Sequence, residues 1–175
     1  TASITDDQIA VSATVPQSFS FALSGNTDSL GTLSTGSVTS SPTPRTATVN
    51  TNAKNGWYVW ARDANTGLTS TSAAATIAST TPGTASTLSA GTEGYNMGVA
   101  QTQAGGSGTV TVATPFVNGA TTGGGLDTTL RTIASSNGTA DTAVLTLTNH
   151  VSISATTAAA TDYSDTITIV GAGLF

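Results

Sequence analysis

The sequence predicts an all-β protein whose strands form an antiparallel β-sandwich of immunoglobulin-like or jelly-roll topology. Apolar residues alternate with polar residues along much of the 175-residue chain, and this period of two is typical of strands that bury one face. No stretch combines helical periodicity with capping residues. Clusters of Gly, Pro, Asn and Ser separate the alternating runs at short intervals, as turns do between the strands of a sandwich.

The first element is an alternating run that precedes Pro16. Its apolar residues share one parity, so in an extended chain they lie on one face. These residues are Ile9, Val11, Ala13 and Val15. Proline cannot donate to a strand ladder, so Pro16 marks a bend or an edge. We therefore divide the chain into an N-terminal extension, residues 1–15, and a single sandwich domain, residues 16–175.

The domain itself contains further alternating runs that we expect to be strands. They cover residues 19–23, 45–52, 56–63, 94–101, 108–113, 142–155 and 162–170. Residues 68–78 and 126–134 fit a short helix, a loop or an irregular strand. The alanines at 73–75 slightly favour the helix in the first of these stretches.

Composition excludes several classes of function. Four Lys and Arg residues are too few for a nucleic-acid surface, and the chain has no Cys for disulfides or thiolate ligands. No apolar run approaches the length of a membrane span, and nothing indicates a cofactor. Only 7% of residues are charged. With Thr1 opening the chain and no leader before it, we expect an extracellular protein whose secretion signal has been removed.

The few residues that carry acid–base chemistry do not suggest a catalytic or metal site. His150 is the only histidine, and its parity within 142–155 places it opposite Leu145 and Leu147, so we expect it on the exposed face. The pairs Asp6-Asp7 and Asp162…Asp165 are weak candidates for a cation site, because no calcium-loop motif surrounds them. We expect solvated loop acids, no metal and no enzyme.

An aromatic cluster marks the run 56–63. Alternation sends Trp57 and Val59 to one face, and Tyr58 and Trp60 to the other. One pair must face the core. The other, which we take to be Tyr58 and Trp60, lies under a loop, forms a subunit contact or makes a platform for stacking sugars.

Several motifs between residues 45 and 170 resemble those of secreted bacterial surface β-sandwiches. They are Thr51-Asn52-Ala53-Lys54-Asn55-Gly56-Trp57 leading into a strand, Gly67-Leu68-Thr69-Ser70, Tyr95 before a strand, and the closing run Asp162-Tyr163-Ser164-Asp165-Thr166-Ile167-Thr168-Ile169. The families they resemble are the WxL-like cell-surface proteins, the spore-coat-U type and the chaperone-usher-type pilins.

The resemblance implies a structural subunit of an extracellular pilus-like filament or surface layer. Pilin-type subunits of this class resemble incomplete sandwiches that are completed by the N-terminal strand of an identical neighbour. Ile9, Val11, Ala13 and Val15 would then form the donor strand. Two alternatives stay open: the same strand pairs within its own chain, or the protein is a monomeric cell-surface adhesin or carbohydrate-binding module that contacts surface glycans or host cells through Tyr58 and Trp60.

Overall fold

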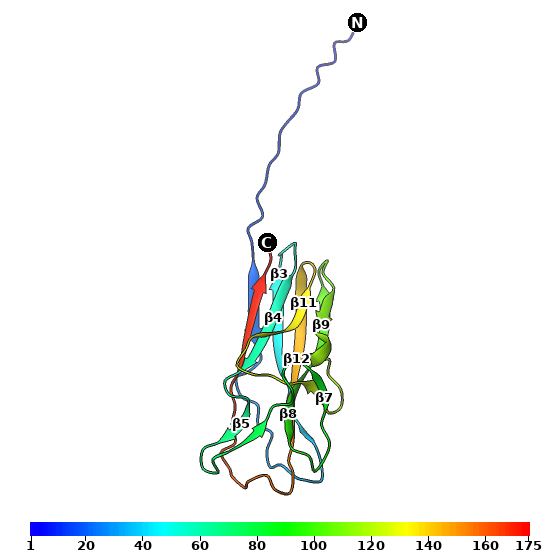
Figure 1. Cartoon of the computed structure of the whole chain (residues 1–175). Helices are drawn as coiled ribbons and strands as arrows, with labels where there is room; N and C mark the ends of the chain where they lie inside the picture. Colours follow the sequence, from blue (N-terminus) through cyan, green and yellow to red (C-terminus); the bar gives the residue numbers. More distant parts are fainter.

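A computed structural model, which describes residues 1–175, confirms the antiparallel β-sandwich (Figure 1). The larger sheet has the strand order β1-β3-β12-β8-β10-β7, with β2 also paired to β12. Its strands are β1 (Phe19–Leu23), β2 (Thr39–Ser40), β3 (Arg45–Thr51), β7 (Ala85–Thr87), β8 (Gly94–Gly105), β10 (Thr122–Gly124) and β12 (Ala140–Ser152). All the strand pairs of this sheet are antiparallel.

The smaller sheet packs against the larger one and has the order β13-β4-β11-β9. Its strands are β4 (Trp57–Asp63), β9 (Val110–Val112), β11 (Arg131–Ser136) and β13 (Ile167–Gly173). A separate hairpin is formed by β5 (Gly67–Ser70) and β6 (Ala75–Ala78), and a single 3-10 turn, η1, covers Thr114–Phe116. No helix in the structure is long and apolar enough to cross a membrane.

The core lies between the two sheets and follows the predicted alternation. Val49 of β3 and Leu145 of β12 face inward from the larger sheet, while Trp57 and Val59 of β4 face them from the smaller sheet. All four side chains are fully buried. Because successive strand residues point to opposite faces, the Thr and Ser residues between them lie on the outer faces.

Two stretches that the sequence left open are now defined. Residues 68–78 do not form a helix, because Thr69 and Ser70 pair with Thr76 and Ala75 across a hairpin. Ala74 lies in its turn with a φ of 49°, so the helical preference of the alanines is overridden by strand pairing. Residues 126–134 run into strand β11, which pairs with both β4 and β9.

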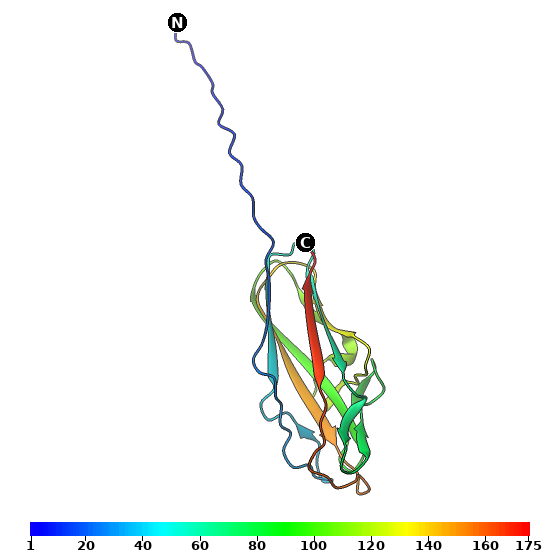
Figure 2. The ribbon, with the colours of Figure 1, turned by 90° about the vertical axis from the view of Figure 1, so that its left-hand side faces the viewer.

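The N-terminal extension stands outside the sandwich. Residues 1–18 have no secondary structure and run away from the body along its long axis (Figures 1 and 2). The segment expected to be a strand at 9–15 therefore has no partner strand in its own chain. The base of the extension is held by Asn52, whose Nδ2 donates to Pro16 O at 2.8 Å and whose Oδ1 accepts from Ser18 N at 2.8 Å.

The extension leaves the sandwich at the same end as the C-terminus, which we call the exit end. There Asn55 N donates to Leu174 O at 3.1 Å, beside the β3–β4 turn that holds the extension. The β5–β6 hairpin and the segment before β13 lie at the opposite end (Figure 1). The extension and this far end therefore lie on opposite sides of the molecule along its long axis.

One side of the sandwich is closed only near the exit end. β1 and β13 are the outer strands of the two sheets on this side. Phe19 and Phe21 of β1 cover β13 at Gly173 and Gly171, where a Cβ would lie 3.0 Å and 2.8 Å from the two rings. The glycines thus leave space for the aromatic side chains. Beyond Leu23, where β1 ends, no such aromatic pair covers this side.

Candidate functional site

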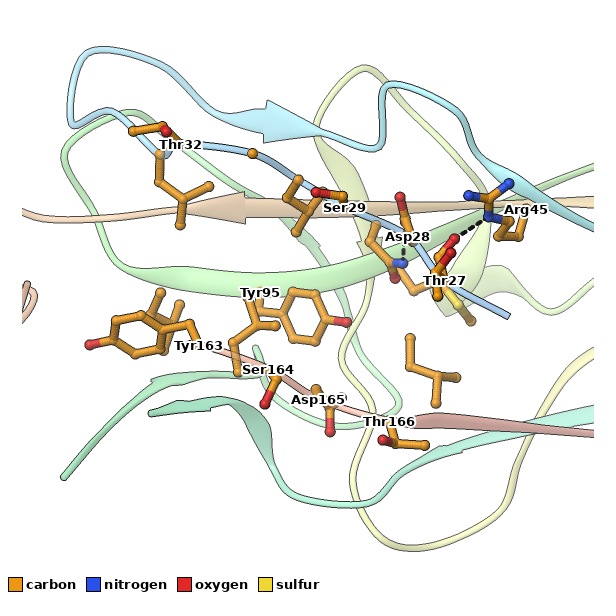
Figure 3. Close-up of a pocket in the computed structure, with 18 of the residues that line it drawn as sticks. Thr27, Asp28, Ser29, Thr32, Arg45, Tyr95, Tyr163, Ser164, Asp165 and Thr166 are labelled. Atoms are coloured by element: carbon orange, nitrogen blue, oxygen red, sulfur yellow. Dashed lines mark hydrogen bonds between the residues drawn. The ribbon is translucent and has the colours of Figure 1, made fainter. Parts of the chain in front are cut away.

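A groove occupies the part of this side that β1 leaves open. It has a volume of about 1000 Å³, which is at the upper end of the range of ligand pockets, roughly 300–1,000 Å³. Residues 23–33 form one wall, and residues 157–167 lead into β13 along the other. Figure 3 shows Thr27, Ser29 and Thr32 on one side of the groove and Tyr163 to Thr166 on the opposite side.

Apolar side chains line the groove without being fully covered. Leu23 is 44% exposed, although it belongs to a strand of the larger sheet. The other partly buried apolar side chains of the groove are Leu30, Leu33, Leu68, Ile153, Tyr163, Ile167 and Ile169. They pack beside Ile77, Tyr95 and Val151 or on the main core. A contiguous apolar surface of this kind is typical of a binding surface.

Two unpaired strand edges reach the groove, that of β1 at Leu23 and that of β13 at Ile167 and Ile169. β1 pairs only with β3, and β13 pairs only with β4, so each has one edge without a neighbouring strand. Backbone N–H and C=O groups along such an edge are available to an additional strand. The groove therefore offers both apolar contacts and backbone hydrogen bonds to an extended segment.

Charged side chains in the groove lining are few. Asp28 accepts hydrogen bonds from Ser41 Oγ at 2.5 Å and from Asn149 Nδ2 at 2.8 Å. Arg45, the first residue of β3, donates from Nε to the backbone oxygen of Thr27. Arg45 has no carboxylate partner, because the only ion pair of the chain joins Arg131 to Asp127. The third charged group of the lining is Asp165.

Asp165 belongs to a buried pair of carboxyl groups with Asp63. Asp63, at the end of β4, is fully buried and accepts from Ser79 Oγ at 2.9 Å. When both groups are ionised, Asp63 Oδ1 and both oxygens of Asp165 are buried without a donor. Burial and the negative charge of Asp165 raise the pKa of Asp63 to about 7. Asp63 therefore retains its proton at mildly acidic pH.

The other acids of the weak cation candidates do not converge. Asp162 binds the β5–β6 turn, where it accepts from Ser70 Oγ at 2.5 Å and from Ser72 N at 2.9 Å, and these hydrogen bonds hold its pKa below the usual range. Asp6 and Asp7 lie exposed in the extension. No three His, Cys, Asp or Glu residues gather at one point of the chain.

The expectation that His150 lies on an exposed face is wrong. His150 is 1% exposed, with Ser40 Oγ 2.7 Å from Nδ1 and Asn118 Oδ1 3.2 Å from Nε2. Its face of β12 is indeed opposite Leu145, but the side chain of Asn118 covers this face. Asn118 follows Val117, which forms a bridge with Val99 of β8. Asn118 lies so close to Gly98 that a Cβ at Gly98 would be 2.0 Å from its Oδ1. Burial lowers the pKa of His150.

The aromatic pair on the outer face of β4 is not covered by a loop. Tyr58 is 37% exposed, and its ring stacks on Trp60 with the centroids 5.5 Å apart and the planes 18° from parallel. Each ring thus uses one face against the other. Val170 of β13, which pairs with Trp60, is also 37% exposed and extends this outer patch.

The extension presents a second exposed apolar face. Ile9 and Val11 are 89% exposed and Val15 is 80% exposed, and Ala13 is exposed between them. Residues 1–15 form no hydrogen bond with the rest of the chain. An exposed apolar face of this kind is stabilised when another apolar surface covers it.

The chain matches no family model, no curated protein and no solved structure. The groove and the extension therefore stand on their own geometry. Sequence reasoning found the extension through its alternation but missed the groove, because the groove depends on where β1 stops relative to β13. It also missed the Asp63 and Asp165 pair, since these residues are about a hundred positions apart. A signal was present: Asp63 has the parity of the buried residues Trp57, Val59 and Ala61.

Proposed function

We propose that this protein is a structural subunit of an extracellular pilus-like filament or surface layer, in which the N-terminal extension of one copy adds as a strand to the groove of the next. The observation that carries the proposal is that one chain has both an exposed alternating extension and an open apolar groove, which the free edges of β1 and β13 reach. An apolar strand and an open apolar groove with free strand edges can cover each other.

The contacts would be strong without disulfides. Burial of Ile9, Val11, Ala13 and Val15 removes four aliphatic side chains from water, and burying a Val- or Ile-sized side chain contributes roughly 1.5–3 kcal/mol. Backbone hydrogen bonds to the edge of β13 add about 1 kcal/mol each. Part of this free energy offsets the loss of freedom when subunits associate.

The arrangement also favours a filament over a closed dimer. The extension leaves from the exit end, whereas the groove extends toward the far end. A second copy placed beyond the exit end would therefore bring its groove to the extension. Donor and acceptor are different surfaces, so the contact is heterologous and repeats from copy to copy.

The alternative function, an adhesin or carbohydrate-binding module that uses Tyr58 and Trp60, has weaker support. Sugars stack on free aromatic faces, and each of these rings has one face against the other. The outer patch with Val170 suits lateral contacts between copies as well as it suits a ligand. We therefore base the proposal on the groove.

Electron microscopy and size-exclusion chromatography of the purified chain test this proposal. We expect uniform fibres from the natural sequence and a monomer of about 17 kDa from Val11→Asp, which places a charge on the apolar face. Ser12→Asp is the matched control, because it adds the same charge on the opposite face and should still form fibres. Monomers from the natural chain, or normal fibres from Val11→Asp, would overturn the proposal.

A further inference from the structure

We infer that Arg45 is the site that fixes the register of the incoming extension, by pairing with Asp7 of the neighbouring copy. This inference rests on the proposed function and adds a specific ionic contact to it. The observations behind it are the charges of the groove lining and the parity of the extension.

The groove contains one cation without a carboxylate partner. Arg45 lines the groove and uses Nε to bind Thr27 O, but no acid of its own chain lies within ion-pair distance. It is only partly buried. A carboxylate that arrives from outside would meet a guanidinium with free N–H groups, which bind carboxylates in charge-assisted hydrogen bonds.

The extension carries a carboxylate on its apolar face. Asp7 has the same parity as Ile9, Val11 and Val15, so a strand that turns these residues into the groove turns Asp7 inward as well. Asp6 points to the opposite face. A carboxylate on an otherwise apolar donor face needs a partner in the groove, because an unpaired charge taken from water is strongly unfavourable.

The spacing within the extension places Asp7 deep in the groove when Val15 is at its entrance. Asp7 precedes Val15 by eight positions. Eight residues of extended chain span about 26 Å. Figure 3 places Arg45 toward the end of the groove where Thr166 leads into β13, and Tyr163 toward the other end.

The direction of the strand follows from the head-to-tail arrangement. An extension that enters at the far end of the next copy places Val15 near that end and Asp7 deeper in the groove, toward Arg45. It then runs antiparallel to β13, whose C-terminal end lies at the exit end. Pro16 and the two following residues remain to bridge the two bodies.

Parity and charge favour this register over its neighbours. A shift by one residue turns the whole apolar face outward. A shift by two or more residues moves Asp7 away from Arg45, which is the only cation of the groove lining. The register that places Asp7 beside Arg45 therefore pairs the carboxylate while the aliphatic face of the extension stays turned into the groove.

Charge reversal in the complete chain tests the inference. We expect Asp7→Lys and Arg45→Glu each to reduce the rate of fibre growth about tenfold or more, because each creates a like-charge pair across the contact. Asp6→Lys is the matched control for the extension and Arg62→Glu, on the exposed face of β4, for the groove. Both controls should assemble at the rate of the natural chain.

Mixing the two single variants gives the decisive result. In an equimolar mixture Lys at position 7 meets Glu at position 45, and natural Asp7 meets natural Arg45, so an alternating fibre should grow at least tenfold faster than either variant alone. The chain that carries both changes should also assemble. These rescues exclude misfolding as the cause of the single defects, and Asp7→Lys lies outside the fold in any case.

The possible outcomes separate strand addition from the contact between Asp7 and Arg45. If the natural chain forms no fibres, the proposed function fails, and the register contact fails with it. If the natural chain assembles and Asp7→Lys grows as fast as Asp6→Lys, strand addition stands but the Asp7 to Arg45 contact is overturned. Single defects without rescue in the mixture would overturn the contact as well.

Discussion

Asp63 and Asp165 bring two carboxyl groups together where their oxygens are shielded from water. Neither has an arginine or lysine partner, and the charge of Asp127 adds to the unfavourable potential at Asp63. Protonation of Asp63 relieves this repulsion and supplies the missing donor. The stability of the fold is therefore coupled to pH through this pair.

The coupling predicts a loss of stability toward neutral pH. The pKa of Asp63 is about 7 in the fold and 3.8 in the unfolded chain. Its stabilising contribution is complete below pH 4 and is lost as the pH rises through 7, by up to about 4 kcal/mol. Asp63→Asn should make the stability of the domain less dependent on pH. At pH 8 the variant should unfold at a higher temperature than the natural chain.

Thermal unfolding at pH 5 and pH 8 checks this, in the chain without residues 1–15 so that assembly does not contribute. Asp141→Asn, at an exposed carboxylate of β12, is the control and should leave the pH dependence intact. A variant Asp63→Asn that loses stability equally at both pH values would show that the pair is not the source of the effect.

His150 shows where residue-scale prediction from the sequence stops. Its parity was assigned correctly, since it lies on the face of β12 opposite Leu145. The error was the assumption that this face meets water. Asn118, more than thirty positions earlier, covers it, and no local pattern in 142–155 contains that information.

At the scale of the elements, β1 and β13 decide where the sandwich is open. Phe19 and Phe21 close the side at the exit end by packing on Gly171 and Gly173, and β1 then stops at Leu23. The two sheets share no hydrogen-bonded strand on this side. The groove is open because β1 is short. The opposite wall, residues 157–167, continues past the point where β1 ends.

This contact predicts that Gly171→Val destabilises the domain by about 1–3 kcal/mol, since a side chain there would overlap the ring of Phe21. Val170→Ala changes the neighbouring residue on the outer face and should alter stability by less than about 0.5 kcal/mol. Urea denaturation of the chain without residues 1–15 measures both. Equal effects of the two substitutions would mean that Phe21 does not pack closely on β13.

The elements themselves were largely predictable. Alternation located β3, β4, β8, β9, β12 and β13 to within a few residues, because each buries one face in the core. The hairpin at 67–78 was not predictable, since its alanines prefer helix and its pairing depends on both strands meeting. The short strands β2, β7 and β10 were missed because two or three residues are too few for a period to appear.

At the scale of the whole molecule, the extension and the groove lie toward opposite ends of one elongated body. Residues 1–15 contribute no strand and no hydrogen bond to the domain, while every strand pair lies within residues 19–173. The domain should therefore fold without its extension and keep an open groove. Strand addition can therefore be tested with the extension and the domain as two separate molecules.

The most direct measurement is the binding of a peptide with the sequence of residues 1–18 to the chain that lacks residues 1–15. Titration calorimetry measures the affinity and stoichiometry, and thermal unfolding measures the stability of the complex. We expect saturable one-to-one binding and a higher unfolding temperature, since the peptide binds only the folded state. A control peptide carries aspartate in place of Val11 and should bind at least tenfold more weakly. Absence of saturable binding by the natural peptide, or equal binding of the control, would contradict strand addition.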